Sequence, residues 1–344
     1  MPSIKNTPST YAESGVDISA EKTDIDILSK WTKKTFEFGN VLAKFGHYAN
    51  LIEFGDYALA LTTDGVGSKI LLAQIADKYD TIGIDCVAMN VNDLLAMGIK
   101  PIGFVDYLAI EGPLGSLTEP IAKGLYEGCK QSMMPLLGGE LATLPDIIKG
   151  VKRPGFDLAG TAMGVVKKDK IITGERIKPG DVVLGLPSSG LHSNGFTLAR
   201  KLIKANNLTN SIVFGNKTWI EELLIPTTIY VKEILDLVEN LDVLGLAHIT
   251  GGGFTKLKRL TDFGFNLNNF PDILPIFKEL QKLGNISNEE MAKTYNLGIG
   301  FVIVVAKENV AKAKQILNKY RDAFVLGEIV ETGKITISSL GVTL

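Results

Sequence analysis

Hydrophobic positions along the chain fall into two kinds of segment. Predominantly apolar runs of strand length occur at residues 57–63 and 104–110, and a turn sequence containing glycine follows each of them. Longer segments, such as residues 117–132 and 228–240, carry apolar residues at helical spacing on one face. No apolar run approaches the ~20 residues that cross a bilayer. Short apolar runs alternating with amphipathic segments predict an α/β or α+β fold.

This alternation occurs on both sides of a charged break at residues 167–170. In the first part the predicted strands are 57–63, 104–110, 135–138 and 156–166, and the predicted helices are 29–38, 79–97 and 117–132. In the second part the predicted strands are 181–186, 297–306 and 324–329, and the predicted helices are 195–206, 228–240 and 308–320. A chain of 344 residues exceeds one average domain. We therefore expect two domains, residues 1–167 and 168–344.

Charge and cysteine content exclude several classes of function. The 36 Lys and Arg residues nearly balance the 38 Asp and Glu residues, which argues against a surface for nucleic acid or anionic membranes. Two cysteines and three histidines argue against a disulfide framework and a protein-only zinc centre. The polar N-terminal segment does not resemble a signal peptide, so we expect a cytoplasmic protein.

Glycine is the one residue type in surplus, with 36 among 344 residues, about 10% against a usual ~7%. These glycines do not form the common phosphate-binding loop, the dinucleotide-binding fingerprint or the nucleophile elbow of hydrolases. Any phosphate that they bind must therefore be held by a different sequence pattern.

The segment at residues 62–69 places an acid, two glycines and a lysine directly after an apolar strand. The backbone N–H groups of Gly65 and Gly67 can approach phosphate oxygens, Asp64 can hold Mg²⁺, and Lys69 can offset phosphate charge. A hairpin turn with a solvated lysine explains the same pattern, and both interpretations stay open.

Two further acids lie in comparable positions. Asp93 stands beside Leu94 and Leu95 on a predicted buried helix, where an unpaired carboxylate is costly. Glu140 follows Gly138 and Gly139, for which the pattern predicts a tight turn after a strand. Oxygen ligands of this kind are typical of magnesium and nucleotide chemistry. A helix cap or a paired structural acid remains the alternative for Asp93.

Two loops combine histidine with glycine and small polar residues. The first contains His192, Ser193 and Asn194 just before a predicted helix, and the second contains His248 before a run of three glycines. Small polar groups at a helix N-terminus are suited to bind anions or amides. A structural role for either histidine is the alternative.

Taken in order, these segments resemble the phosphoribosylformylglycinamidine cyclo-ligase family, the aminoimidazole ribonucleotide synthetases of purine biosynthesis. The matching segments are residues 11–18, 63–69, 80–85, 88–93, 138–140, 188–195, 247–254 and 295–300. The likeness is collinear and spans nearly the whole chain, so it is far more specific than any single motif.

The resemblance implies a homodimer whose N-terminal sheets pair, and a ring closure of formylglycinamidine ribonucleotide driven by ATP and Mg²⁺. The implied metal ligands are Asp64, Asp93 and Glu140; the implied nucleotide-binding residues are Asp64, Gly65, Gly67, Lys69, Asp93, Ser193, Asn194, Gly251 and Gly252; the implied catalytic residues are His192, His248 and Lys69. The lysine that contacts the ATP phosphates is left open, with Lys30, Lys33 and Lys44 as further candidates, because the glycine run of many relatives is reduced here to Gly46.

Other enzymes of the same superfamily are the nearest alternatives. A thiamine-monophosphate kinase, a selenophosphate synthetase or a hydrogenase-maturation dehydratase would share the acidic pocket but not both polar loops. A selenium enzyme would also need a reactive cysteine near the N-terminus, and none precedes Cys86. A silent nucleotide-binding scaffold would have no reason to retain the three acids.

Overall fold

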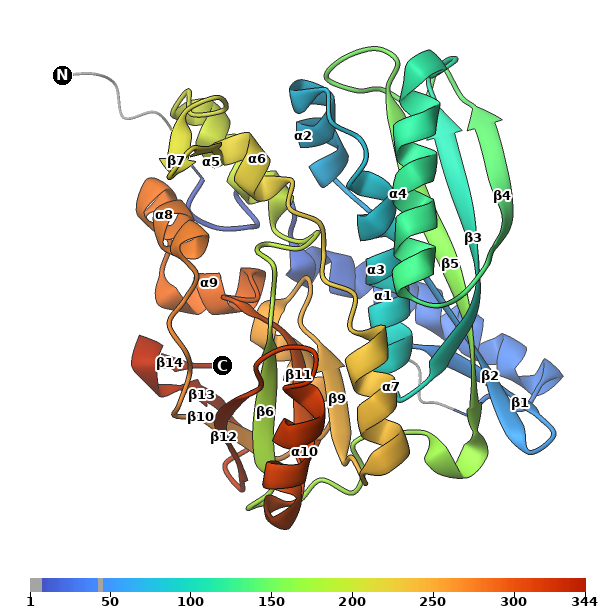
Figure 1. Ribbon diagram of the computed structural model, residues 1–344, viewed down its shortest axis with the longest axis vertical. Helices are drawn as coiled ribbons and strands as arrows, with labels where there is room; N and C mark the ends of the chain where they lie inside the picture. The colour runs from blue at the N-terminus through green and yellow to red at the C-terminus, as the bar shows by residue number, and fades with distance from the viewer. Residues whose placement is uncertain (1–7, 43–45) are drawn as a thin grey trace.

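The computed structural model describes residues 8–42 and 46–344 and contains two large β-sheets with helices packed against them (Figure 1). The first sheet comes from the N-terminal half of the chain and the second from the C-terminal half. Strands and helices alternate in both halves, so the predicted mixed α/β character is confirmed. None of the described helices is long and apolar enough to cross a membrane.

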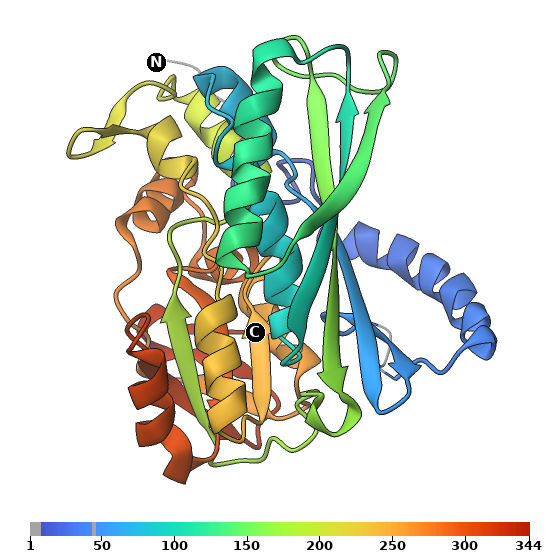
Figure 2. The ribbon, with the colours of Figure 1, turned by 45° about the vertical axis from the view of Figure 1, so that its right-hand side comes forward.

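The first sheet has the strand order β1-β2-β5-β3-β4. Its strands span Asn50–Phe54 (β1), Tyr57–Gly65 (β2), Lys100–Ile110 (β3), Leu136–Thr143 (β4) and Phe156–Lys167 (β5). Strands β3 and β4 pair in parallel, and the other neighbouring strands pair antiparallel. Helices α3 (Ile82–Leu95) and α4 (Thr118–Gln131) cover one face of this sheet (Figure 2).

Gly83 of α3 and Gly124 of α4 allow these two helices to approach closely. A Cβ atom at position 83 would lie 2.1 Å from the backbone N of Leu125, and one at position 124 would lie 2.6 Å from the carbonyl O of Asp80. Neither distance is possible without separating the helices. Part of the glycine surplus therefore serves helix packing, a role that the sequence pattern alone does not reveal.

The second sheet has the strand order β14-β13-β10-β12-β6-β11-β9. Its strands span Val182–Pro187 (β6), Gly245–His248 (β9), Gly264–Leu267 (β10), Ile299–Val305 (β11), Phe324–Val330 (β12), Ile335–Ile337 (β13) and Val342–Thr343 (β14). Strand β11 is buried along its whole length. Helices α7 (Val231–Asn240) and α10 (Val310–Leu317) pack together over this sheet (Figure 1).

The remaining elements connect or flank the two sheets. They include α1 (Ile18–Lys34), α2 (Lys69–Ala76), α5 (Phe196–Ala205), the hairpin β7 (Ile212–Phe214) and β8 (Lys217–Thr218), α6 (Trp219–Leu223), the 3₁₀ segment η4 (Gly253–Arg259), α8 (Pro275–Gly284) and α9 (Asn288–Thr294). Strand β2 continues directly into α2, so the segment around Asp64 is a strand-to-helix connection. The alternative of a hairpin turn at this point is therefore wrong.

Two predicted segments differ from the structure. The helix expected at residues 29–38 begins earlier, as α1, and ends in a short 3₁₀ turn at Thr35–Phe38. The apolar side chains of α1, among them Leu28 and Trp31, are exposed, which explains why no buried face marks its true length. The tight turn expected at Gly138 and Gly139 is instead the middle of β4.

Candidate functional site

Asp64 and Asp93, two of the predicted acids, lie near each other where the halves of the chain meet. Asp64, the last residue but one of β2, lies on the face that α3 covers, because its register partner Gly160 stands directly over the buried ring of Phe104. Burial and the charge of Asp93 raise the pKa of Asp64 to about 6, although the Gly65 N–H donates a 2.8 Å hydrogen bond to its carboxylate. This pair therefore holds an excess of negative charge that a bound cation would relieve.

His248 sets the orientation of Asp93. The Asn92 amide donates to the Thr228 carbonyl at 2.8 Å and accepts from the Tyr230 N–H at 3.1 Å, so its orientation is defined. Its nitrogen lies 3.4 Å from Nε2 of His248, which must therefore accept. The ring proton is then on Nδ1, which donates to the Asp93 carboxylate at 2.8 Å. One acid of the pair is thus held by the C-terminal half.

Lys256 and Arg259 add positive charge beside the two acids, and both contact Tyr48. The Tyr48 hydroxyl donates to the Lys256 carbonyl at 3.3 Å, and the Arg259 guanidinium lies 5.0 Å from the centre of the Tyr48 ring. Burial and then Arg259 lower the pKa of Lys256 to about 8, while the charges of Asp93 and Asp64 oppose this shift. Two acids and two bases from both halves therefore form one electrostatic group.

Lys69 is fully buried and cross-links the two halves. Its ammonium donates to Asp85 at 3.0 Å, to the His192 carbonyl at 2.9 Å and to the Ile225 carbonyl at 2.7 Å. Asp85 in turn accepts from the N–H and the hydroxyl of Thr227, at 2.7 and 2.6 Å. An ammonium has three protons, so contact with a phosphate would require one of these bonds to break.

His192 lies beneath the surface in its polar loop. It is 1% exposed with a φ of +64°, and its Nε2 accepts a 3.3 Å hydrogen bond from the Ser189 N–H. Burial, followed by the positive charges of neighbouring groups, holds its pKa well below the usual range. The ring packs beside Tyr230 and Gly300. In this conformation His192 is a neutral buried group, and its predicted catalytic role stays a prediction.

The other polar and glycine positions lie around the same junction. The Ser193 hydroxyl bonds that of Thr227 at 3.0 Å, and a Cβ atom at Gly251 would lie 2.9 Å from Oδ1 of Asn194. The two polar loops predicted from the sequence are therefore in contact. Gly67 has a φ of +72°, and nothing lies within 4 Å of where its Cβ atom would stand, so the space beside it is open.

Glu140 is on the opposite face of the first sheet from Asp64. It is the register partner of the exposed Tyr107, whereas a Cβ atom at the preceding Gly139 would contact Asp106 on the helix-covered face. Within residues 8–42 and 46–344, no three His, Cys, Asp or Glu side chains come close enough to hold a metal ion. The described part of one chain therefore assembles the Asp64–Asp93 pair but not the predicted set of three carboxylates.

Comparisons with known proteins identify the family. Residues 46–166 match the family described as "AIR synthase related protein, N-terminal domain", and residues 178–339 match its C-terminal domain. A phosphoribosylformylglycinamidine cyclo-ligase of Pyrococcus furiosus is 48% identical over 337 residues, which cover 97% of this chain and 98% of the relative. One of Methanococcus vannielii is 50% identical over 334 residues, covering 95% and 93%. This chain belongs to the phosphoribosylformylglycinamidine cyclo-ligase family. As a member of this family it is an enzyme of the ligase class.

Solved structures share the cyclo-ligase fold at low sequence identity. AaThiL complexed with AMPPCP and TMP has a TM-score of 0.64 at 16% identity, covering 90% of this chain and 91% of its own. A HypE–HypF complex has a TM-score of 0.63 at 21% identity, covering 87% and 92%. T. maritima PurL complexed with ADP has a TM-score of 0.57 at 17% identity, covering 91% of this chain and 47% of that one. These likenesses show the fold, and two of the three proteins were solved with a nucleotide or nucleotide analogue.

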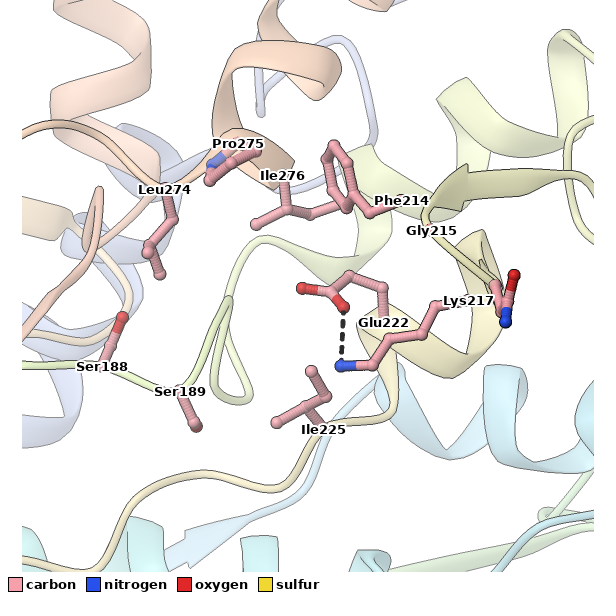
Figure 3. Close-up of a pocket in the computed structure, with 11 residues that line it drawn as sticks. Ser188, Ser189, Phe214, Gly215, Lys217, Glu222, Ile225, Leu274, Pro275 and Ile276 are labelled. Atoms are coloured by element: carbon pink, nitrogen blue, oxygen red, sulfur yellow. Dashed lines mark hydrogen bonds and ion pairs between the residues drawn. The ribbon is translucent and has the colours of Figure 1, made fainter.

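A cavity of about 700 Å³ borders the first polar loop of this cyclo-ligase (Figure 3). Ser188 and Ser189 of that loop line one side of it, and the Lys217–Glu222 ion pair, at 3.5 Å, lies on another. Ile225, whose carbonyl accepts from Lys69, also lines the cavity. The cavity is therefore connected through Lys69 to the loop that holds His192.

Several residues of this site escaped prediction from the sequence. Asn92 stands beside a predicted acid, yet only the fold shows that it sets the tautomer of His248. Tyr48, Lys256 and Arg259 lie outside the sequence motifs described above. Lys256 and Arg259 belong to η4, which begins at the last glycine of the second loop. Among the lysines proposed to contact ATP, Lys30 is exposed on α1, and Lys44 lies outside the described residues.

Proposed function

We propose that this protein closes the imidazole ring of formylglycinamidine ribonucleotide, using ATP, and releases 5-aminoimidazole ribonucleotide, ADP and phosphate in cytoplasmic purine biosynthesis. The observation that carries the proposal is identity of 48–50% over nearly the full length of relatives with that enzyme name. The acidic pair Asp64 and Asp93, placed between two polar loops, supports a site for a cation and a phosphorylated ligand.

In the proposed reaction the γ-phosphoryl group of ATP passes to the formyl amide oxygen, which gives an iminophosphate. An amidine nitrogen of the same molecule then attacks that carbon, a proton leaves the nitrogen, and phosphate departs with the former amide oxygen. No protein nucleophile is needed, so the main tasks of the site are to position the reactants and to stabilise charge.

The residues of this chain fit a magnesium ion at the acidic pair. Burial and then the charge of Asp93 raise the pKa of Asp64, and carboxylate oxygens are ligands that Mg²⁺ prefers. When bound, Mg²⁺ would neutralise charge on the ATP phosphates. Asp64 and Asp93 would hold it, His248 would keep Asp93 in position, and the open space beside Gly67 would admit the phosphates. Glu140 would join such a site only from another protomer.

The remaining predicted residues would serve the substrate side and the junction between two domains, 1–167 and 168–344. Ser193 and Asn194 lie against Thr227 and Gly251, and the neighbouring cavity offers space for part of the substrate. Buried His192 and Lys69 would support this loop from below. We therefore assign the first polar loop and its cavity to the ribonucleotide.

An assay with formylglycinamidine ribonucleotide, ATP and Mg²⁺ tests the proposed function. We expect one ADP for each molecule of diazotisable aminoimidazole product. Parallel reactions that replace the ribonucleotide should release no ADP above background with thiamine monophosphate and no AMP with selenide. Release of ADP with thiamine monophosphate or of AMP with selenide, and no ADP with the ribonucleotide, would assign the protein to another branch of the superfamily.

The protein is also proposed to be a homodimer formed through the first sheet. The sheet face opposite α3 and α4 exposes large apolar side chains, including Ile52, Leu61, Val105 and Tyr107. Register pairs such as Leu61 with Met163 place these side chains on one continuous face. An exposed apolar patch of this kind on a soluble enzyme is typical of an interface.

Charge on this face should prevent assembly. We expect the double variant Leu61→Glu/Val105→Glu to sediment as a monomer, because a two-fold axis would bring like charges together in an apolar interface. Tyr126→Glu, which changes an exposed aromatic residue on α4, is the matched control and should leave the dimer intact. A wild-type monomer, or a double variant that still sediments as a dimer, would contradict the proposed interface.

A further inference from the structure

Lys256 has no role in the sequence motifs, yet its side chain reaches the centre of the candidate site. It belongs to η4, which begins at Gly253, the last glycine of the second polar loop. A Cβ atom at Gly252 would lie 3.6 Å from Cε of Lys256, so the side chain folds back over the glycine loop. Gly252 itself has a φ of +90°, which favours glycine there.

The backbone of Lys256 is fixed while its ammonium group is not. Its carbonyl accepts the 3.3 Å hydrogen bond from Tyr48, and Tyr48 in turn packs under Arg259. Among the described residues, no carboxylate lies within ion-pair distance of the Lys256 ammonium, and no hydrogen bond is formed by it. Lys69 differs in this respect, because all three of its protons are used within the protein.

The charges around Lys256 suit a ligand that combines a metal cation with an anionic group. Without a ligand, the positive charges of Lys256 and Arg259 face the negative charges of Asp64 and Asp93. A magnesium ion on the two carboxylates would cancel that attraction and leave the ammonium free to face an anion. The phosphates of a magnesium nucleotide meet both requirements, and an ammonium binds phosphate as a compact point charge.

We propose that Lys256 binds the γ-phosphoryl group of ATP and holds it against the Asp64–Asp93 pair. This inference rests on the proposed use of ATP. The ammonium would form a charge-assisted hydrogen bond to a γ-oxygen and take no part in proton transfer. Lys256 follows the glycine loop, which also contacts Asn194, so this loop would connect the bound phosphoryl group to the first polar loop.

Binding of two nucleotides with and without a γ-phosphate group tests this role. We would measure Mg–AMPPCP and Mg–ADP by calorimetry with the wild type and with Lys256→Met. We expect the variant to bind Mg–AMPPCP about 10- to 100-fold more weakly, the loss typical of one charge-assisted hydrogen bond, and to bind Mg–ADP within about threefold of the wild type. Lys256→Arg should recover part of the lost affinity.

Lys258→Met is the matched control, since it removes the same charge from the same 3₁₀ segment while its side chain bonds the Gly333 carbonyl elsewhere. It should bind both nucleotides as the wild type does. Unchanged binding of Mg–AMPPCP by folded Lys256→Met, or equal weakening of both nucleotides, would overturn the inference and leave ATP use intact. A wild type that binds neither nucleotide would instead overturn the proposed function, and with it the role of Lys256.

Discussion

Replacing Asp64 with Asn is expected to lower turnover by at least about 100-fold, the scale seen when one preorganised charge-stabilising group is lost. The same change should raise the melting temperature of the metal-free protein. The pKa of Asp64 is raised to about 6 from the ordinary value of 3.8, so its ionisation opposes folding. Asn removes this cost, because it carries no charge beside Asp93.

The gain in melting temperature of Asp64→Asn should depend on pH, because it comes from the ionisation of Asp64. Above pH 6 Asp64 is ionised in both folded and unfolded protein, and the full cost applies; below about pH 4 it is protonated in both, and the cost vanishes. Thermal unfolding in chelator should therefore show the largest gain for Asp64→Asn above pH 6, and little gain near pH 4. Asp80→Asn, at an exposed carboxylate, should change neither turnover nor melting temperature. Near-normal turnover in Asp64→Asn would remove this residue from the proposed metal site.

Replacing Lys69 with Met is expected to lower the free energy of unfolding by about 3–5 kcal/mol, the usual cost of removing one partner of a buried ion pair. Lys69 and Asp85 have no exposed side-chain surface, and the distance from the Lys69 ammonium to the nearer Asp85 oxygen is 2.8 Å. Among the residues that the structure describes, only Thr227 would then still donate hydrogen bonds to the buried Asp85 charge. It also frees the carbonyls of His192 and Ile225, so the first polar loop should loosen.

Chemical denaturation of four proteins checks this prediction. The double variant Lys69→Met/Asp85→Asn should recover part of the loss, since no unpaired charge then remains buried. Lys78→Met, at a half-exposed lysine 3.9 Å from Asp80, should stay within about 0.5 kcal/mol of the wild type. A loss below about 1 kcal/mol in Lys69→Met would mean that Lys69 does not hold the two halves together, and would favour its alternative role at the phosphates.

Helices and strands with a regular hydrophobic pattern could be predicted from the sequence, because burial of one face requires apolar residues at a fixed spacing. The run at residues 57–63 and the amphipathic segment at 117–132 appear as β2 and α4 within a few residues. The turn predicted at Gly138 and Gly139 is wrong, because a contact with another strand explains a glycine here. The Asp106 side chain occupies the space where a Cβ atom of residue 139 would stand. Short strands such as β9 escaped prediction, since four buried residues carry no distinctive period.

The candidate site likewise contains residues that the sequence predicts and others that depend on tertiary contacts. Asp64 and Asp93 stood out in the sequence because acids beside apolar runs are unusual, and the structure brings them together. The sequence could not show that Lys69 is buried and fully bonded, or that Glu140 points to the opposite face, because both depend on register and on contacts between distant segments. The sequence could not identify Lys256 as a site residue either. Its side chain approaches the two acids only because it folds back over Gly252.

The fate of the formyl oxygen is the most direct test of the proposed reaction. The enzyme would be supplied with formylglycinamidine ribonucleotide labelled with ¹⁸O in the formyl group, together with unlabelled ATP and Mg²⁺, and the released phosphate would be analysed by mass spectrometry. The proposed iminophosphate route predicts one ¹⁸O atom in each phosphate, in step with aminoimidazole product. Unlabelled phosphate accompanying ring closure would contradict phosphoryl transfer to that oxygen, and the absence of ring closure by folded enzyme would contradict the assignment as a whole.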